Sequence, residues 1–203
     1  MRQDGNNGVP ILLAVVIVLH VILAVAWIRT DRTPPYWDEA WYLWQGATQL
    51  EHLREGDLRG WFAAWSSLDR TRPSLVPALT VPFFAAFGVS AASGLLVNVA
   101  ALVALLLAVY ALGSAVHSPR AGLVAAMVVG GFPALIGLVH ILLVEMVMLT
   151  FVAATLLALW RSEGLEHRGW ALAAGLLTGL GFLSKVFYGV FVAGPWLVTL
   201  WRA

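Results

Sequence analysis

Residues 9–27 read VPILLAVVIVLHVILAVAW, an uninterrupted apolar run of 19 residues. A helix needs about 20 apolar residues to cross the hydrocarbon core of a bilayer. The run leads directly into Trp27-Ile28-Arg29, which is typical of a helix edge at the membrane surface. A signal peptide would have a shorter apolar core and a small-residue cleavage site. We therefore expect this run to be a retained first membrane span.

The composition of the whole chain is that of a multi-span membrane protein. Hydrophobic residues make up 61% of the 203 residues and charged residues only 11%, which excludes an ordinary soluble domain. The net charge is +1 and no basic run is present, so we expect no nucleic-acid partner. The chain has no cysteine, which excludes disulfides and thiolate metal sites.

The apolar segments after the first predict further spans. They cover roughly residues 94–115, 122–139, 142–160, 170–183 and 189–201. Together with the first run they predict an all-α, polytopic transmembrane helical bundle of about six spans.

The segment from Arg29 to Arg72 has a different character. It holds six arginines and seven acidic residues, so it cannot lie in hydrocarbon. Within it, residues 40–53 contain two rows at helical spacing, which predicts an amphipathic helix at the membrane surface. The rows are Trp41, Trp44 and Thr48, and Leu43, Ala47 and Leu50.

Residues 74–89 are apolar but too short for a clear span, and Pro73, Pro77 and Pro82 interrupt or border them. They form either a short tilted span or a helix half-inserted from one side. If they do not cross, the N-terminus and the loops at 117–120 and 161–168 share one side of the membrane. Asp38, Glu145 and Lys185 then share the other. Span length and proline content favour this arrangement, although the many arginines of the long loop conflict with a simple positive-inside count.

Two carboxylate positions are unusual in so apolar a chain. Asp38 and Glu39 lie in the stretch YWDEAWY, residues 36–42, just before the predicted amphipathic helix. Asp38 either caps that helix, with Glu39 in its first turn, or acts as a general base or metal ligand. Glu145 has apolar neighbours on both sides, so it is a candidate for function, unless it reaches water or pairs with His140. Together with Asp38 it could hold a divalent cation such as Mg or Mn.

Three cations are candidates for binding phosphate. Lys185 follows an apolar run in which Gly175 and Gly179 predict close helix packing. Arg70 and Arg72 end the long loop, and arginine can hold phosphate in a bidentate manner. Each of the three could instead be an interfacial anchor or a solvated side chain. Carboxylates and cations on one surface beside lipid suit a lipid-linked phosphate as substrate.

Several short motifs along the chain resemble those of one enzyme superfamily. In order they are Asp38-Glu39-Ala40-Trp41-Tyr42, Gly56-Asp57-Leu58, Arg72-Pro73-Ser74-Leu75, Glu145 and Gly179-Leu180-Gly181-Phe182-Leu183-Ser184-Lys185. This order resembles the glycosyltransferase C superfamily. The nearest branch contains protein O-mannosyltransferases, lipid A aminoarabinose transferases and the RgtA/B/C/D-like enzymes. The chain departs from the family pattern in having Glu at 145, where Asp is more frequent, and Arg at 72.

The resemblance implies an inverting-type hexosyl or pentosyl transferase. It would move a sugar from a polyprenyl-phosphate donor to a hydroxyl of a lipid, glycan or protein acceptor. The reaction would take place on the extracytoplasmic face of the plasma (inner) membrane, among membrane lipids. Residues 29–93 would be the first extracytoplasmic loop with two juxtamembrane helices. Because family members are usually several hundred residues longer, we expect residues 1–203 to be one N-terminal module of a longer enzyme.

The resemblance also implies roles for individual residues. Asp38 and Glu39 would be catalytic, with Asp38 as the base or next to it. The donor phosphate and substrate would be bound by Arg72, Lys185, Arg70 and Tyr42. Asp38 and Glu145 are the positions that bind a divalent cation in some members.

Two other classes of function remain open from the sequence. The chain could be a non-catalytic membrane transporter or lipid-binding scaffold, or an inactive fragment that keeps the fold. Transporters tend to carry charges near the bilayer midplane on broken helices. The charges here fall at span ends, which favours the transferase.

Overall fold

The computed structural model describes residues 8–66 and 74–203, and every regular element in those residues is an α-helix. The helices are α1 (Gly8–Thr30), α2 (Trp37–Arg54), α3 (Leu58–Ser66), α4 (Leu75–Phe87), α5 (Ala91–Val116), α6 (Pro119–Gly130), α7 (Pro133–Val139), α8 (Val144–Arg161), α9 (Arg168–Ser184) and α10 (Tyr188–Arg202). The predicted all-helical membrane bundle is confirmed.

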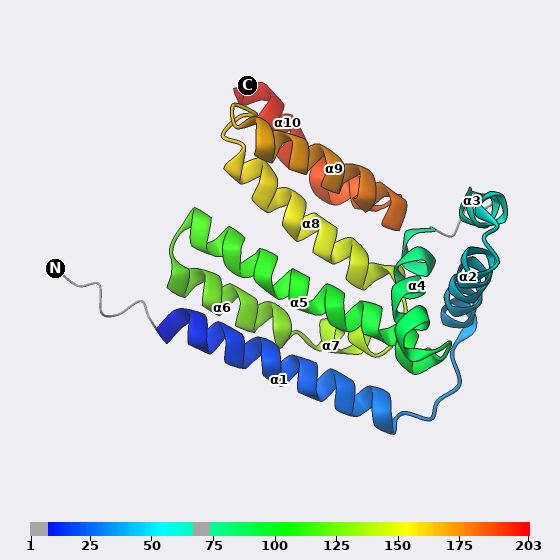
Figure 1. The fold of residues 1–203 in the computed structure, drawn as a ribbon. Helices are drawn as coiled ribbons and strands as arrows, with labels where there is room; N and C mark the ends of the chain where they lie inside the picture. The colour runs from blue at the N-terminus through cyan, green and yellow to red at the C-terminus, as the bar shows by residue number, and fades with distance from the viewer. Residues whose placement is uncertain (1–7, 67–73) are drawn as a thin grey trace.

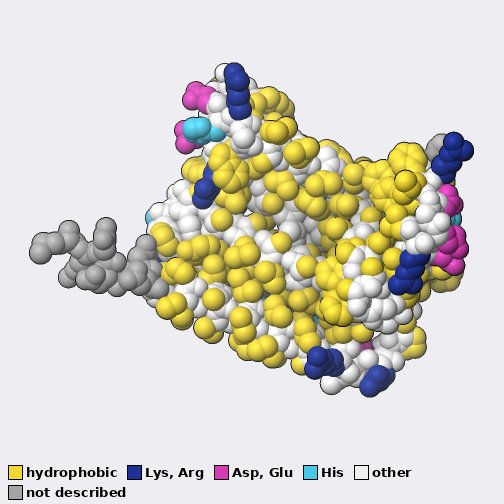
Figure 2. Space-filling model, viewed as in Figure 1, with side chains coloured by type: hydrophobic (Ala, Val, Ile, Leu, Met, Phe, Trp, Pro, Cys, Tyr) yellow, Lys and Arg dark blue, Asp and Glu magenta, His cyan; other side chains and the backbone are white. Residues whose placement is uncertain are grey.

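Helices α1, α6, α5, α8 and α9 lie side by side in this order (Figure 1). Along the chain, their directions alternate from α1 to α5, α6, α8 and α9. Helix α5 is central, because it packs against α1, α4, α6 and α8. It is apolar on all sides, and Leu102 and Leu106 are buried in the core. Helix α1 lies at the edge and leaves apolar side chains such as Ile11 and Ile22 exposed. A space-filling view shows hydrophobic side chains across the middle of the molecule and charged ones at its ends (Figure 2).

Three described helices are long and apolar enough to cross a membrane, namely α1, α5 and α8. A fourth span results if the bent pair α6 and α7 is counted as one. Helices α9 and α10 have 17 and 15 residues, fewer than the about 20 that a membrane span needs. The predicted count of about six spans thus includes helices at or below the length that a crossing needs.

The span predicted over residues 122–139 is broken. Helix α6 ends at Gly130, α7 begins at Pro133, and the two are bent by 66°. Proline has no backbone N–H and its ring clashes with the preceding turn, so Pro133 cannot continue α6, although it suits the first turn of a new helix. The bend carries the chain to the loop of residues 140–143.

Helices α2, α3 and α4 lie at one end of the bundle (Figure 1). Helix α4 has 13 residues and crosses over this end instead of running along the bundle. This placement and the short length of α4 support the arrangement in which residues 74–89 do not span. The ends of α5, α8 and α10 lie together at the opposite end, as the sequence predicted.

Helix α2 includes the residues 40–53 that were predicted to form an amphipathic helix. The side chains that it buries differ from the two rows of side chains predicted for that helix. The buried residues are Glu39, Tyr42, Gly46, Gln49 and Leu50, while Trp44 is exposed. Gly46 explains this orientation, since a Cβ there would meet Thr80 and Phe84 of α4. The helix turns its smallest residue toward α4, which allows a close approach.

The predicted close packing at Gly175 and Gly179 is wrong, because a Cβ at either position would meet open space. Gly181 is the tightly packed glycine of α9. A Cβ there would meet the ring of Tyr188, whose hydroxyl lies 2.7 Å from the Thr155 hydroxyl of α8. This contact fixes the start of α10 against α8 and α9.

Candidate functional site

The first turn of α2 carries the acidic pair. Tyr36, with an extended backbone (φ −74°, ψ 168°), occupies the N-cap position. The alternative in which Asp38 is the N-cap is therefore wrong, because the N-cap lies two residues earlier and the helix begins at Trp37. Asp38 and Glu39 both lie in the first turn, where a negative charge is favoured by the helix dipole.

Glu39 is 8% exposed, and both of its carboxylate oxygens accept backbone hydrogen bonds. Oε2 accepts from the N–H of Tyr36 at 3.3 Å, which closes the helix start. Oε1 accepts from the N–H of Leu142 at 3.0 Å, across 103 residues of chain. Hydrogen bonds to an ionised group are the strong ones in proteins. Glu39 therefore ties the first turn of α2 to the loop between α7 and α8.

Asn98 of α5 holds the same loop from the other side. Its side chain is fully buried, and its Nδ2 donates to the carbonyls of Leu138 at 3.0 Å and Ile141 at 2.7 Å. Asn98 was not predicted from the sequence as a site residue. Its signal was a lone amide in an otherwise apolar span, because a buried polar group needs a partner. Glu39 and Asn98 together fix the backbone that leads into α8.

Glu145 and Lys185 form an ion pair at the same end of the bundle. Glu145 lies in the first turn of α8, and Lys185 is the first residue after α9. The two side chains are 30% and 32% exposed, so the pair is open to one side. Glu145 thus pairs with Lys185, not with His140, whose ring stacks on Trp27 at 4.3 Å.

Two further predicted site residues, Asp38 and Tyr42, lie in α2. Asp38 is half-buried beside Glu39, and Tyr42 is buried one turn further along α2. The Tyr42 ring meets Trp41 edge-on at 5.5 Å. Arg70 and Arg72 lie outside the described residues.

The described residues do not form a metal-binding cluster. Within residues 8–66 and 74–203, no group of three or more His, Asp or Glu side chains is close enough to hold an ion. The Glu145 carboxylate faces an ammonium group, which competes with a cation for the same oxygens. The predicted Asp38–Glu145 cation site is therefore not supported by this arrangement.

Two groups near the site have altered acidity. Burial lowers the pKa of His140, although the charge of Asp31 acts in the opposite direction. Hydrogen bonds from Thr33 lower the pKa of Asp31, since its Oδ1 accepts from the Thr33 hydroxyl at 2.7 Å and from the backbone N–H at 2.9 Å. His140 is thus favoured as neutral and Asp31 as ionised.

The fold places the acidic pair Asp38 and Glu39, the buried Asn98 and the Glu145–Lys185 ion pair at a single end of the membrane bundle. Asp38 neighbours Glu39, which contacts Leu142, and Leu142 lies three residues before the Glu145 that holds Lys185. A half-buried carboxylate can take up a proton, and an ammonium at the same end of the bundle can stabilise a developing anion.

A comparison with known protein families gives a match that covers most of the chain. The pattern of the dolichyl-phosphate-mannose-protein mannosyltransferase family matches residues 71–202. The match includes the positions of Arg72, Glu145 and Lys185 and begins after Asp38. Curated proteins and solved structures give no match. The chain therefore belongs to the dolichyl-phosphate-mannose-protein mannosyltransferase family of membrane glycosyltransferases, within the glycosyltransferase C superfamily.

Proposed function

We propose that this chain transfers a sugar from a polyprenyl-phosphate donor to an acceptor hydroxyl, on the extracytoplasmic face of the plasma (inner) membrane. The observation that carries the proposal is the Glu145–Lys185 pair, at the same end of the bundle as the first turn of α2. The Glu39–Leu142 hydrogen bond joins these two regions. The family membership supports a sugar transferase as the class of enzyme.

Asp38 is the proposed base. A carboxylate within hydrogen-bond reach of the acceptor hydroxyl takes its proton as the oxygen attacks the anomeric carbon. The new C–O bond forms on the face opposite the polyprenyl phosphate, and the bond from the anomeric carbon to the phosphate oxygen breaks. The electron pair leaves with the phosphate, so the configuration of the sugar is inverted. Asp38 holds the proton until solvent removes it.

Lys185 is the proposed partner of the leaving phosphate. Negative charge grows on that phosphate during transfer, and a cation already aimed at the site stabilises it without rearrangement. Glu145 holds the Lys185 ammonium in place in the absence of donor. Arg72 and Arg70, as loop cations, are proposed to bind the same phosphate.

Glu39 and Tyr42 are proposed to act by positioning the base. Both side chains are buried, and both carboxylate oxygens of Glu39 accept hydrogen bonds from backbone N–H groups. The donor's polyprenyl chain would lie in the lipid beside the apolar helices. The acceptor would be a lipid, glycan or protein that reaches this surface.

The test uses the full-length protein in membranes with dolichyl-phosphate mannose as the probe donor. Asp38→Asn keeps the shape of the side chain and removes the base, so turnover should fall about 10²- to 10⁴-fold. Asp31→Asn is the matched control, because Asp31 lies in the loop after α1 and bonds to Thr33. Unchanged turnover in Asp38→Asn would rule out the proposed base.

A further inference from the structure

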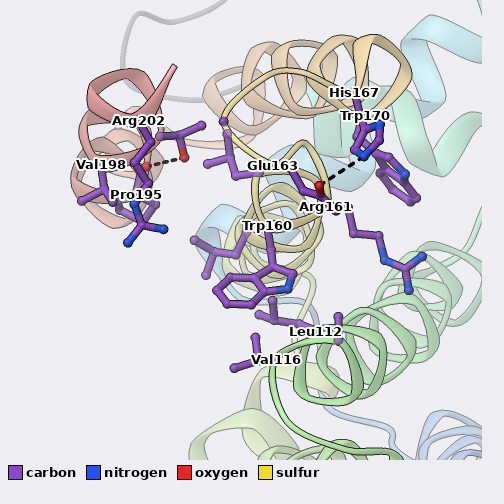
Figure 3. Close-up of a pocket in the computed structure, with 15 residues that line it drawn as sticks. Leu112, Val116, Trp160, Arg161, Glu163, His167, Trp170, Pro195, Val198 and Arg202 are labelled. Atoms are coloured by element: carbon purple, nitrogen blue, oxygen red, sulfur yellow. Dashed lines mark hydrogen bonds and ion pairs between the residues drawn. The ribbon is translucent and has the colours of Figure 1, made fainter.

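A large groove lies at the end of the bundle opposite the acidic pair. Its volume is about 1100 Å³, above the range of about 300–1,000 Å³ that is usual for small-molecule pockets. The last turns of α5, α8 and α10 and the loop after α8 form its walls (Figure 3). The proposed transfer reaction does not use this groove.

One part of the groove is apolar and fits a hydrocarbon chain. Leu112 and Val116 of α5 face Pro195 and Val198 of α10 across it. Trp160 and Trp170 lie at the charged rim, and tryptophan is enriched where the hydrocarbon core meets the headgroups. The groove therefore runs from hydrocarbon depth toward the headgroup level.

The rim of the groove carries two arginines. The Arg161 guanidinium lies 5.2 Å from the ring centroid of Trp170, which orients it by a cation–π contact. Arg202 reaches the groove from the end of α10, and Figure 3 shows the two arginines on either side of Trp160. Within the described part of the chain, neither arginine takes part in an ion pair.

The lining also contains one acidic residue, Glu163. The Glu163 carboxylate lies 3.4 Å from Nε2 of His167, and Figure 3 shows it directed toward that ring. Arg120 and Arg168 lie at the same end, at the starts of α6 and α9. The rim is thus basic, whereas the interior is apolar.

We propose that this groove binds an anionic phospholipid of the adjacent leaflet. The acyl chain lies against Leu112, Val116 and Val198, and the headgroup phosphate accepts hydrogen bonds from Arg161 and Arg202. Arginine suits this role because its planar donors match phosphate oxygens. The apolar wall next to the cations favours a phospholipid over free phosphate, and basic pockets between membrane helices are known to hold such headgroups.

Native mass spectrometry of the detergent-purified protein tests the proposal. Phosphatidylglycerol and phosphatidylcholine with identical acyl chains are titrated separately. Two basic residues near an anionic headgroup should favour phosphatidylglycerol by about thirtyfold. The double variant Arg161→Gln/Arg202→Gln should lose this preference. Equal binding of the two lipids by the unaltered protein would overturn the proposal.

Arg120→Gln is the matched control, since Arg120 lies at the same end but lines a separate, shallower pocket. It should keep the preference, and a loss equal to that of the double variant would assign binding to net charge instead of the groove. Inorganic phosphate in millimolar excess should leave the lipid bound, and displacement would contradict a phospholipid site. A photoactivatable phosphatidylglycerol should label residues 156–164 and 195–202 of the unaltered protein. Labelling concentrated elsewhere would overturn the proposal even if the double variant fails to fold.

Discussion

At the end of the bundle formed by α2 and the start of α8, Glu39 and Asn98 are buried and bonded to backbone groups, whereas at the opposite end polar side chains line an open groove. Glu39 and Asn98 each hold the loop before α8, and Glu145 holds Lys185. Arg161 and Arg202 instead border a cavity of about 1100 Å³. The first end is organised to keep groups in place, as a reaction requires, and the second to leave room for an apolar molecule.

After the loss of the proposed base, the largest expected effect concerns the Glu145–Lys185 pair. Lys185→Met removes the cation proposed to stabilise the leaving phosphate and should lower turnover about 10²- to 10³-fold. Lys185→Arg, which keeps the charge, should restore part of the activity. Transfer from dolichyl-phosphate mannose is the measurement, and full activity in Lys185→Met would contradict the proposed role.

The next effect concerns the attachment of α2. Glu39→Ala leaves the N–H of Leu142 buried without its acceptor, which should lower the free energy of unfolding by about 1–3 kcal/mol. Glu51→Ala is the control, because Glu51 lies on the same helix but is exposed. Unfolding in bicelles is the measurement. If both variants lose the same stability, Glu39 does not tie the two regions together.

Gln49 lies on the same helix as Glu39 and differs from it in its hydrogen bonding. Its side chain is fully buried, and within the described residues neither polar atom has a hydrogen-bond partner. Gln49→Leu should therefore raise the free energy of unfolding, by about 1 kcal/mol, since burying an unpaired amide is costly. A lower stability for this variant would mean that the amide is satisfied in the folded protein.

The smallest expected effect is the pH dependence from His140. Because burial lowers its pKa below the ordinary value of 6.5, the folded protein takes up a proton less readily than the unfolded chain. Stability should then fall as the pH drops from about 6.5 through the lower pKa of the folded state. His140→Phe keeps an aromatic ring against Trp27 and should show a weaker dependence between pH 7 and pH 5. Identical melting-temperature profiles would contradict the assignment.

Much of the fold follows from local hydrophobicity. Apart from α3, which was not predicted, the helices lie within a few residues of the predicted segments, because a helix that crosses or borders a membrane must be apolar along most of its length. The short helix at residues 75–87 also followed from its length and prolines. The break between α6 and α7 was missed, although Pro133 is the residue that makes a continuous helix unfavourable.

The candidate site was predicted in part. The carboxylates and Lys185 stood out because charges are rare in this chain, and the parity of the helices correctly assigned them to one end. The partner of Glu145, the cap of α2 and the role of Asn98 were not predicted. Each depends on which backbone or side chain lies opposite, and sequence spacing does not report that.

The sequence by itself determined that this is a helical membrane protein with its rare charges at the ends of its helices, because the cost of placing a charge in hydrocarbon acts on each residue separately. Only the tertiary structure decided that Glu39 binds the N–H of Leu142, 103 residues away, and that α5, α8 and α10 leave a groove between their last turns. Such contacts and cavities depend on how helices pack, and packing is decided by the shapes of all the side chains together.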